Sequence, residues 1–208
     1  DPGKLTIQSL GVDLKERFVP SANMSRSRPE ILFVGRLVEG KGLSFLLDAM
    51  PSILESVPSA TLTIAGFGPC EEDARRQVRR LGIQESVRFE GAVPQSRLPP
   101  LYQRAAVFVA PFVPSRTGAQ EGLGLVTIEA MGCGCPVVAS DVPALQDLAS
   151  LGGIRLVPPG SPEDIAKAVV ATLEDPLAIG AARAGLEERF DWTAVAARYA
   201  ACIREAMN

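Results

Sequence analysis

The sequence predicts an α/β protein with a doubly wound parallel sheet of about six strands flanked by helices. From residue 30 onward, short β-branched apolar runs alternate with longer stretches of helical spacing. The runs are apolar at consecutive positions, which is typical of strands buried on both faces of a parallel sheet. With 208 residues, 47% of them hydrophobic, the chain is long enough to bury a sizeable core without disulfides or metal.

The elements are expected in a regular order along the chain. Residues 1–29 are mixed and become rich in Pro, Ser and Arg, so we interpret them as a connector. Strands are expected at the apolar runs Ile31–Val34, Thr61–Ala65, Val87–Glu90, Val107–Ala110, Pro136–Ala139 and Ile154–Val157. Because ligands of such sheets bind beyond the carboxyl ends of the strands, the loops that follow these runs are the candidate sites.

Helical spacing of apolar residues predicts a helix after each of the first five strands and three consecutive helices after Pro162. In chain order these helices are expected at Leu43–Ser56, Glu71–Leu81, Gln95–Gln103, Leu123–Met131, Ala144–Ala149, Asp164–Leu173, Leu177–Arg189 and Thr193–Ala206. The alternation of strand and helix thus continues to the sixth strand, and the chain then ends in helices.

Composition excludes several classes of function. The net charge is 21 − 24 = −3, so nothing favours nucleic acid as the main partner. Four scattered cysteines and no histidine give neither a disulfide framework nor a usual zinc site, so we expect no metal. The apolar runs are too short to span a membrane and no leader pattern precedes them, so we expect a cytoplasmic protein.

The loop after the first strand, GRLVEGKG at residues 35–42, combines three glycines with two cations at the start of a helix. Glycines let the backbone approach a ligand, a helix N-terminus favours anions, and Arg36 and Lys41 supply charge-assisted hydrogen bonds to phosphate oxygens. The pattern suits a diphosphate. By spacing alone, a solvated turn with ordinary surface charges explains the loop about as well.

A second constellation surrounds Glu121 and Glu129, which are eight residues apart. Eight helical residues advance about 12 Å, so the two carboxylates are not an adjacent acid–base pair. Gly122 and Gly124 leave backbone amides open at the expected helix start. Glu129 has mostly apolar neighbours, which indicates a semi-buried carboxylate that is hydrogen-bonded to something.

Taken together, these motifs resemble a known family. The Glu-x7-Glu spacing within EGLGLVTIEAMGCGCPVVASD, with GRLVEGKG and the IAGFGP segment at 64–69, is similar to the retaining GT-B glycosyltransferases of family 4, called group 1. Further similar motifs are Phe89-Glu90-Gly91, the segment 158–162 and Phe190-Asp191-Trp192. The resemblance covers nearly everything from Glu30 to the C-terminus.

The resemblance implies a Rossmann-like domain that is the C-terminal, donor-binding half of a GT-B enzyme. Residues 1–29 would be the interdomain connector and residues 30–208 the nucleotide-sugar binding domain, with the N-terminal acceptor domain absent from this chain. Family members take a histidine near the reaction centre from that other domain, which fits a chain without histidine. The full-length protein is therefore expected to be a glycosyltransferase of class EC 2.4, and the isolated domain to be inactive.

Site residues follow from the same resemblance. Arg36 and Lys41 would hold the diphosphate and stabilise the leaving group, Glu121 would bind donor sugar hydroxyls, and Glu129 would accept both ribose hydroxyls. These three, Arg36, Lys41 and Glu121, are the expected catalytic residues. The expected donor-binding residues are Gly35, Gly66, Gly68, Gly91, Gly122, Leu123, Gly124, Leu125 and Glu129.

The implied donor is a UDP-, GDP- or ADP-sugar, with no cofactor, and the implied acceptor is a sugar, glycan or lipid bound through the other domain. Contact of the full-length protein with the inner membrane face is part of this expectation. Two alternatives stay open, a GT-B nucleotide-sugar epimerase and a non-catalytic nucleotide-binding module. The chain departs from the family pattern at Gly40, where Glu is usual, and at Pro143-Ala144, where Gly-Gly is usual.

Overall fold

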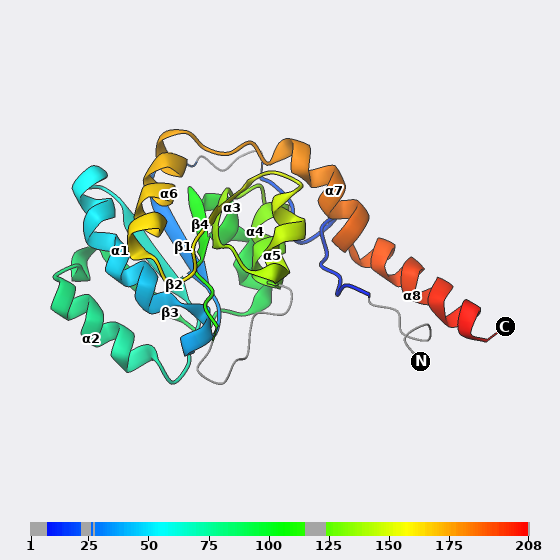
Figure 1. Ribbon diagram of the computed structural model, residues 1–208, viewed down its shortest axis with the longest axis horizontal. Helices are drawn as coiled ribbons and strands as arrows, with labels where there is room; N and C mark the ends of the chain where they lie inside the picture. The colour runs from blue at the N-terminus through cyan, green and yellow to red at the C-terminus, as the bar shows by residue number, and fades with distance from the viewer. Residues whose placement is uncertain (1–7, 22–25, 27, 115–123, 208) are drawn as a thin grey trace.

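The computed structural model describes residues 8–21, 26, 28–114 and 124–207. Its centre is a sheet of six parallel strands in the order β3-β2-β1-β4-β5-β6 (Figure 1). The strands are β1 Glu30–Val34, β2 Thr61–Ala65, β3 Val87–Gly91, β4 Val107–Ala110, β5 Val137–Ser140 and β6 Ile154–Val157. The predicted doubly wound sheet is confirmed, and each predicted strand lies within one residue of the observed one.

Helices cover both faces of this sheet. They are α1 Leu43–Ser56, α2 Glu71–Leu81, α3 Leu98–Arg104, α4 Leu125–Gly132, α5 Pro143–Ala149, α6 Pro162–Glu174, α7 Gly180–Phe190 and α8 Trp192–Ala206, with short 3-10 helices η2 Glu39–Lys41, η3 Gln84–Ser86 and η4 Gln95–Arg97. The helix expected at Gln95–Gln103 starts as η4 and becomes α-helical only at Leu98. Pro99 and Pro100 follow at its first positions, where a missing amide proton costs nothing.

Strand β1 shows why the sheet is apolar at consecutive positions. Ile31 and Phe33 point to the core beneath α1, α2 and α6, whereas Leu32 and Val34 point to the core beneath α3, α4 and α5. Successive side chains of a strand alternate between its faces, so a strand that is buried on both faces must be apolar throughout. The sheet therefore separates two cores, and helices of the described residues cover both of its faces.

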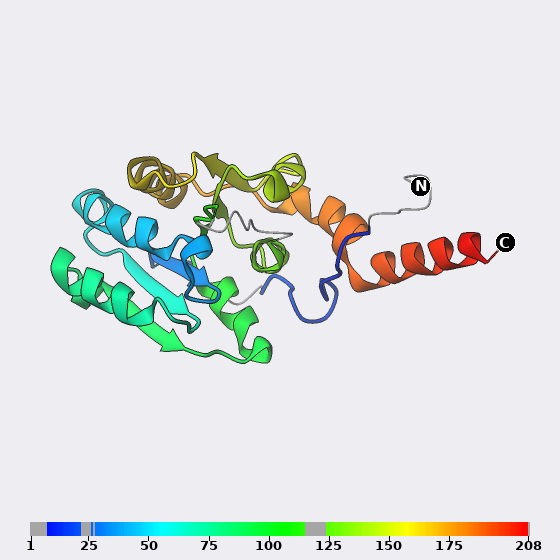
Figure 2. The same ribbon diagram turned by 60° about the horizontal axis from the view of Figure 1, so that its bottom comes forward.

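The segment interpreted as a connector packs against the domain in its described part. Leu14 and Phe18 are fully buried in the core on the α4 side. The amide of Val12 donates to the carbonyl of Phe190 at 2.8 Å, and the amide of Trp192 donates to the carbonyl of Val12 at 3.1 Å. These bonds hold the segment at the junction of α7 and α8, from which α8 extends away from the sheet (Figures 1 and 2).

No helix in the described part of the chain is long and apolar enough to cross a bilayer. The same residues contain no cluster of three or more metal-ligating side chains.

Candidate functional site

The strand order reverses between β1 and β4, which are neighbours in the sheet although β2 and β3 lie between them in the chain. Connections from the two strands run to opposite sides at such a point, so their carboxyl ends bound a crevice where ligands of doubly wound sheets bind. Two loops meet there. Residues 35–42 follow β1, and a second loop that begins at Pro111 follows β4.

The two loops are locked together by backbone contacts. The amide of Val113 donates to the carbonyl of Gly40 at 3.0 Å. Gly42 has a φ of +67°, and a Cβ atom built on it would lie 1.7 Å from the carbonyl oxygen of Pro111. Only glycine combines this left-handed conformation with so close an approach. The start of α1 is therefore fixed against the loop after β4.

Lys41 lies at this junction. Its Nζ is 4.8 Å from the centroid of the Phe112 ring, a cation–π distance, and its aliphatic stem runs past Gly35. Arg36, on the same loop, is exposed, and its guanidinium forms no ion pair or hydrogen bond with any described residue. The loop after β1 thus presents an aromatic-supported ammonium group and a guanidinium group that is available to an anion.

The N-terminus of α4 reaches the same aromatic ring. Gly124 caps this helix with a φ of +61°, and a Cβ atom on it would lie 3.5 Å from the ring of Phe112. The Lys41 ammonium and the amides that open α4 therefore flank one ring. Both the partial positive charge of a helix N-terminus and the lysine favour an anion at this place.

Two buried hydroxyl groups lie close to this edge of the sheet. Thr127 is in the first turn of α4 and Ser140 ends β5, and both are fully buried. Neither hydroxyl has a hydrogen-bond partner among the described residues. An unpaired buried polar group lowers stability. Such groups therefore indicate a place where a ligand or water supplies the missing hydrogen bond.

The loops after β2 and β3 join this arrangement through glycines. A Cβ atom on Gly66 would lie 1.8 Å from the carbonyl oxygen of Gly35, and one on Gly68 would lie 2.5 Å from that of Leu37. The amide of Gly66 also donates to the carbonyl of Gly91 at 2.7 Å. The sequence-predicted glycines therefore link three consecutive loops at one edge of the sheet.

Glu129 lies deeper, on α4. Its side chain is buried, with 5% of the residue exposed. The hydroxyl of Tyr102 donates to Oε2 at 2.9 Å, and Nε2 of Gln95 donates to Oε1 at 3.4 Å. Burial raises the pKa of Glu129 above its ordinary value, while these two hydrogen bonds and the charge of Arg17 oppose that rise.

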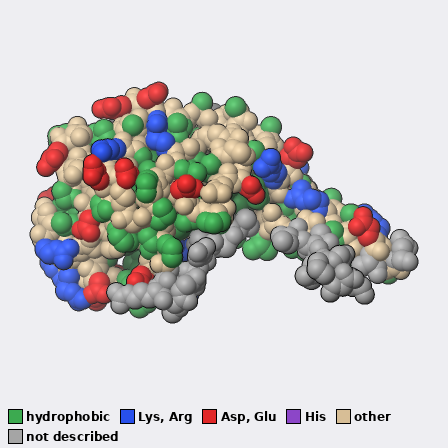
Figure 3. Space-filling view, in the orientation of Figure 1, with side chains coloured by type: hydrophobic (Ala, Val, Ile, Leu, Met, Phe, Trp, Pro, Cys, Tyr) green, Lys and Arg blue, Asp and Glu red, His purple; other side chains and the backbone are tan. Residues whose placement is uncertain are grey.

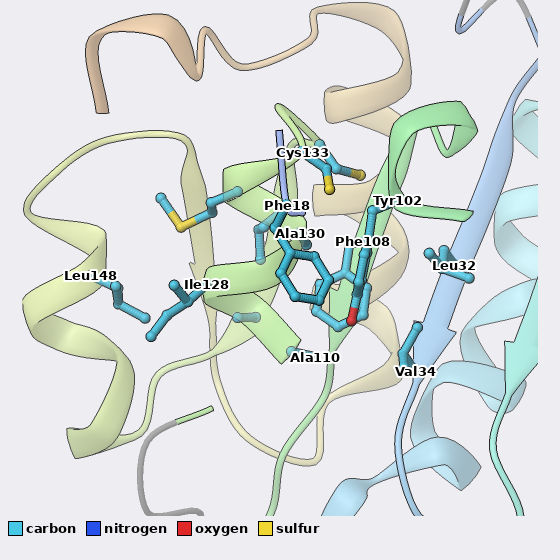
Figure 4. Close-up of a cluster of buried hydrophobic side chains, with 14 of the residues drawn as sticks. Phe18, Leu32, Val34, Tyr102, Phe108, Ala110, Ile128, Ala130, Cys133 and Leu148 are labelled. Carbon is cyan, nitrogen blue, oxygen red and sulfur yellow. The ribbon is translucent and has the colours of Figure 1, made fainter. Parts of the chain in front are cut away.

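Tyr102 comes from α3 and fills the space between α4 and the sheet. Its ring packs edge-on against Phe108 at 5.6 Å between centroids. Figure 4 shows Tyr102 beside Phe108, with Val34 of β1 on one side and Ile128 of α4 on the other. Sequence reasoning did not single out Tyr102, although a tyrosine in an apolar helix needs a partner for its hydroxyl.

Most of the predicted site residues converge, but not all of them are in contact. The loops that carry Arg36 and Lys41 and the predicted glycines of the described part lie at one edge, as does Leu125, the first residue of α4. Glu129 is bound to Tyr102 and Gln95 instead, and no hydrogen bond or ion pair joins it to either cation in the described part. Glu121, Gly122 and Leu123 lie outside the described residues.

The opposite end of the sheet carries a cavity of about 480 Å³, lined in part by Arg26, Pro136 and Arg183. The two guanidinium groups donate there to the carbonyls of Gly132 and Cys133 at the end of α4. They satisfy backbone acceptors that a helix leaves open at its C-terminus. None of the predicted site residues lines this cavity, so we do not assign it to the site.

Comparison with known proteins places this geometry in a family. Residues 28–175 match the family described as glycosyl transferases group 1. The phosphatidyl-myo-inositol mannosyltransferase of Mycobacterium leprae strain TN is 37% identical in an alignment of 182 residues that covers 85% of this chain and 46% of that protein. The chain belongs to the group 1 glycosyltransferases. The resemblance noted in the sequence is confirmed.

Solved structures share the fold of this group 1 chain. The sucrose-phosphate synthase of Thermosynechococcus elongatus matches with a TM-score of 0.80 at 30% identity, over 95% of this chain and 51% of that one. HepE of Anabaena, solved with UDP and glucose, matches with a TM-score of 0.80 at 23% identity, over 93% and 55%, and shows the fold alone. The chain spans about half the length of the curated relatives it matches.

Arginines of helix α2 in this group 1 chain are paired with carboxylates of α2 itself and of α1. Figure 3 shows Lys and Arg side chains gathered over α2 at one end of the molecule. Arg75 pairs with Glu71 at 2.7 Å, and Arg80 lies 3.8 Å from Asp48 of α1. Such exposed pairs contribute little energy each, and they give this helix a structural use for its charges.

Proposed function

We propose that this chain is the donor-binding half of a retaining, metal-independent glycosyltransferase, which transfers a sugar from a nucleoside-diphosphate sugar to an acceptor hydroxyl. The observation that carries the proposal is the meeting of the Lys41 ammonium with the N-terminus of α4 on the Phe112 ring. The exposed Arg36 guanidinium stands on the same loop. These groups form an anion site at the switch point of the sheet, where such folds bind nucleotides.

The chemistry that this site supports is departure of a nucleoside diphosphate. The diphosphate gains negative charge as the bond to the sugar breaks, and Arg36, Lys41 and the amides of α4 stabilise that charge. Glu129 accepts the ribose hydroxyls, because an ionised carboxylate offers only acceptors. We assign no nucleophile from the protein, in keeping with retention by front-side attack, and Glu121 keeps its proposed role toward the sugar hydroxyls.

The names of relatives suggest the donor and acceptor classes. HepE has been solved with UDP and glucose, and the mycobacterial relative is named for mannosyl transfer to phosphatidyl-myo-inositol. We extend to this chain a UDP-, GDP- or ADP-sugar donor, without a cofactor, and an acceptor that is a sugar, glycan or lipid. Its cytoplasmic location, with the full-length protein at the inner membrane face, stays a prediction.

Titration calorimetry of the chain with UDP, GDP and ADP tests the donor site. We expect weak binding of at least one nucleotide. Lys41→Met keeps the stem of the side chain and removes its charge, so it should weaken binding by about 10- to 100-fold, the value of a charge-assisted hydrogen bond. Lys167→Met, which removes a charge paired with Glu163 on α6, is the matched control and should leave binding unchanged. Absence of binding by all three nucleotides contradicts the proposal.

Transfer itself is tested on a protein that includes the remaining half found in the relatives. A screen of nucleotide sugars, with and without a chelator, should give release of nucleoside diphosphate that survives removal of divalent metal, and the product should keep the anomeric configuration of the donor. Nucleotide binding without any transfer would favour the non-catalytic module instead. Conversion of the donor sugar without an acceptor would favour an epimerase.

A further inference from the structure

Glu129 is held by two donors of unequal quality. The bond from the Tyr102 hydroxyl to Oε2 is 2.9 Å long and fully buried, whereas the bond from Gln95 to Oε1 is 3.4 Å long, near the limit of a hydrogen bond. Gln95 is exposed and stands at the start of η4, on the loop that follows β3. A carboxylate offers about four lone-pair sites, so both oxygens retain capacity.

Tyr102 cannot turn away from this contact. Its ring is fully buried and packs edge-on against Phe18 and Phe108, at 6.2 Å and 5.6 Å between centroids. A side chain fixed by packing positions its hydrogen bond without further loss of rotamer freedom. Gln95 is instead shared, because its Oε1 accepts from Nη1 of Arg17 at 3.2 Å. Gln95 can therefore leave Glu129 and keep a partner.

We propose that Tyr102 is a positioning residue for the donor: its hydroxyl fixes Oε2 of Glu129, so that Oε1 exchanges Gln95 for a ribose hydroxyl. This inference rests on the proposed function, because it requires a nucleotide at the site. It assigns to an α3 residue a role in substrate recognition that it performs through Glu129. Tyr102 itself does not touch the donor.

The charge state of Glu129 gives this role a distinctive readout. Burial raises its pKa, and the hydrogen bond from Tyr102 is the first of the interactions that lower it again. The other ionisable groups near it are the guanidinium of Arg17 and the side chains of Cys133 and Tyr102, whose raised pKa values keep the thiol and the phenol neutral. Within this cluster, Glu129 is therefore the group whose charge is lost as the pH falls.

The experiment compares the nucleotide affinity of Tyr102→Phe and of the unchanged protein across about pH 5 to pH 9. The nucleotide used is whichever of UDP, GDP and ADP binds the unchanged chain. Loss of the hydroxyl leaves the ring in place and raises the pKa of Glu129 further, so more of it is protonated as the pH falls. The ratio of the two dissociation constants should grow by about tenfold from the alkaline to the acidic end, the value of one hydrogen bond to a charged group. Titration of the ligand phosphate cancels in this ratio.

Three further variants make the result decisive. Tyr199→Phe changes the other tyrosine, which is half-exposed on α8, and should give a ratio of one at every pH. In a Glu129→Gln background, Tyr102→Phe should no longer cause a pH-dependent change. Gln95→Leu, at an exposed position, removes the second donor without touching the core and should shift the profile in the same direction, which keeps the test available if Tyr102→Phe folds poorly.

A ratio that is the same at all pH values would overturn the inference, since a merely structural tyrosine would lower affinity uniformly. The donor site itself would survive that outcome. If the unchanged protein binds none of the three nucleotides, the proposed function fails, and the role of Tyr102 in donor recognition fails with it.

Discussion

Two glycines in the same backbone conformation allow the contact between the loops after β1 and β4 to be measured. Gly42 and Gly82 have φ values of +67° and +69°, and both cap helices. A Cβ atom on Gly42 would lie 1.7 Å from the carbonyl oxygen of Pro111, whereas one on Gly82 would meet nothing within 4 Å. Alanine at either position has the same backbone strain, so the difference between the two isolates the steric contact.

The expected magnitudes follow from this geometry. A non-glycine residue in the left-handed region lowers the free energy of unfolding by about 1–2 kcal/mol. Alanine loses less chain entropy than glycine on folding, which raises the free energy of unfolding by about 0.4–1 kcal/mol. Gly82→Ala should therefore destabilise the protein by about 1 kcal/mol. Gly42→Ala must also displace the Pro111 backbone, which adds about 1–3 kcal/mol, a typical cost of overpacking.

Urea unfolding of the two variants and the unchanged chain, followed by circular dichroism, measures both losses as shifts in midpoint at a common slope. Calorimetry on the same samples should show weaker nucleotide binding for Gly42→Ala alone, because only that change moves Lys41 and its loop. Equal losses of stability for the two variants would show that the loops after β1 and β4 are not in rigid contact, and would refute the reasoning.

Three further predictions concern other parts of the fold. Burial raises the pKa of Asp191, but hydrogen bonds from Thr193 and neighbouring groups outweigh it and hold the pKa below its ordinary value. Asp191→Asn should therefore lower the free energy of unfolding by about 1–3 kcal/mol at neutral pH. In urea titrations this loss should begin to shrink as the pH falls below about 4 and should disappear once the pH is below the lowered pKa of the folded protein. Burial raises the pKa of Cys133 and Cys135 to about 12, so a thiol reagent should modify them only after unfolding, and rapid labelling of the native protein at these positions would contradict their burial. Phe18→Ala should lower the free energy of unfolding, measured in urea, by about 3–5 kcal/mol. A loss below about 1 kcal/mol would mean that the segment before β1 does not contribute to the core.

The sheet was predictable because its strands are short, β-branched and apolar on both faces. Strand β1 illustrates this, since Leu32 and Phe33 serve different cores and no polar residue interrupts them. The segment before β1 was not predictable in the same way. Leu14 and Phe18 are four residues apart among charged and polar neighbours, and nothing local indicates which core they enter.

The candidate site, too, was predictable from the sequence only in part. Glycine spacing and paired cations made the loop of Arg36 and Lys41 a candidate, and the family resemblance then favoured it over an ordinary solvated turn. The bond between Tyr102 and Glu129 joins residues that are 27 positions apart. It depends on how α3 and α4 pack, and the only trace of it in the sequence is that a buried tyrosine needs a partner.

The interlocked glycines of the loops after β1, β2 and β3 also affect how this surface could change. The backbone of these loops is held by its neighbours, so the side chains that project from it can be substituted without changing the conformation of the loops. Phe67 is such a position, since it is 63% exposed between two glycines that cannot accept a larger residue. Under the proposed function, single replacements at such exposed positions change the preference among donors and leave the backbone beneath them unaltered.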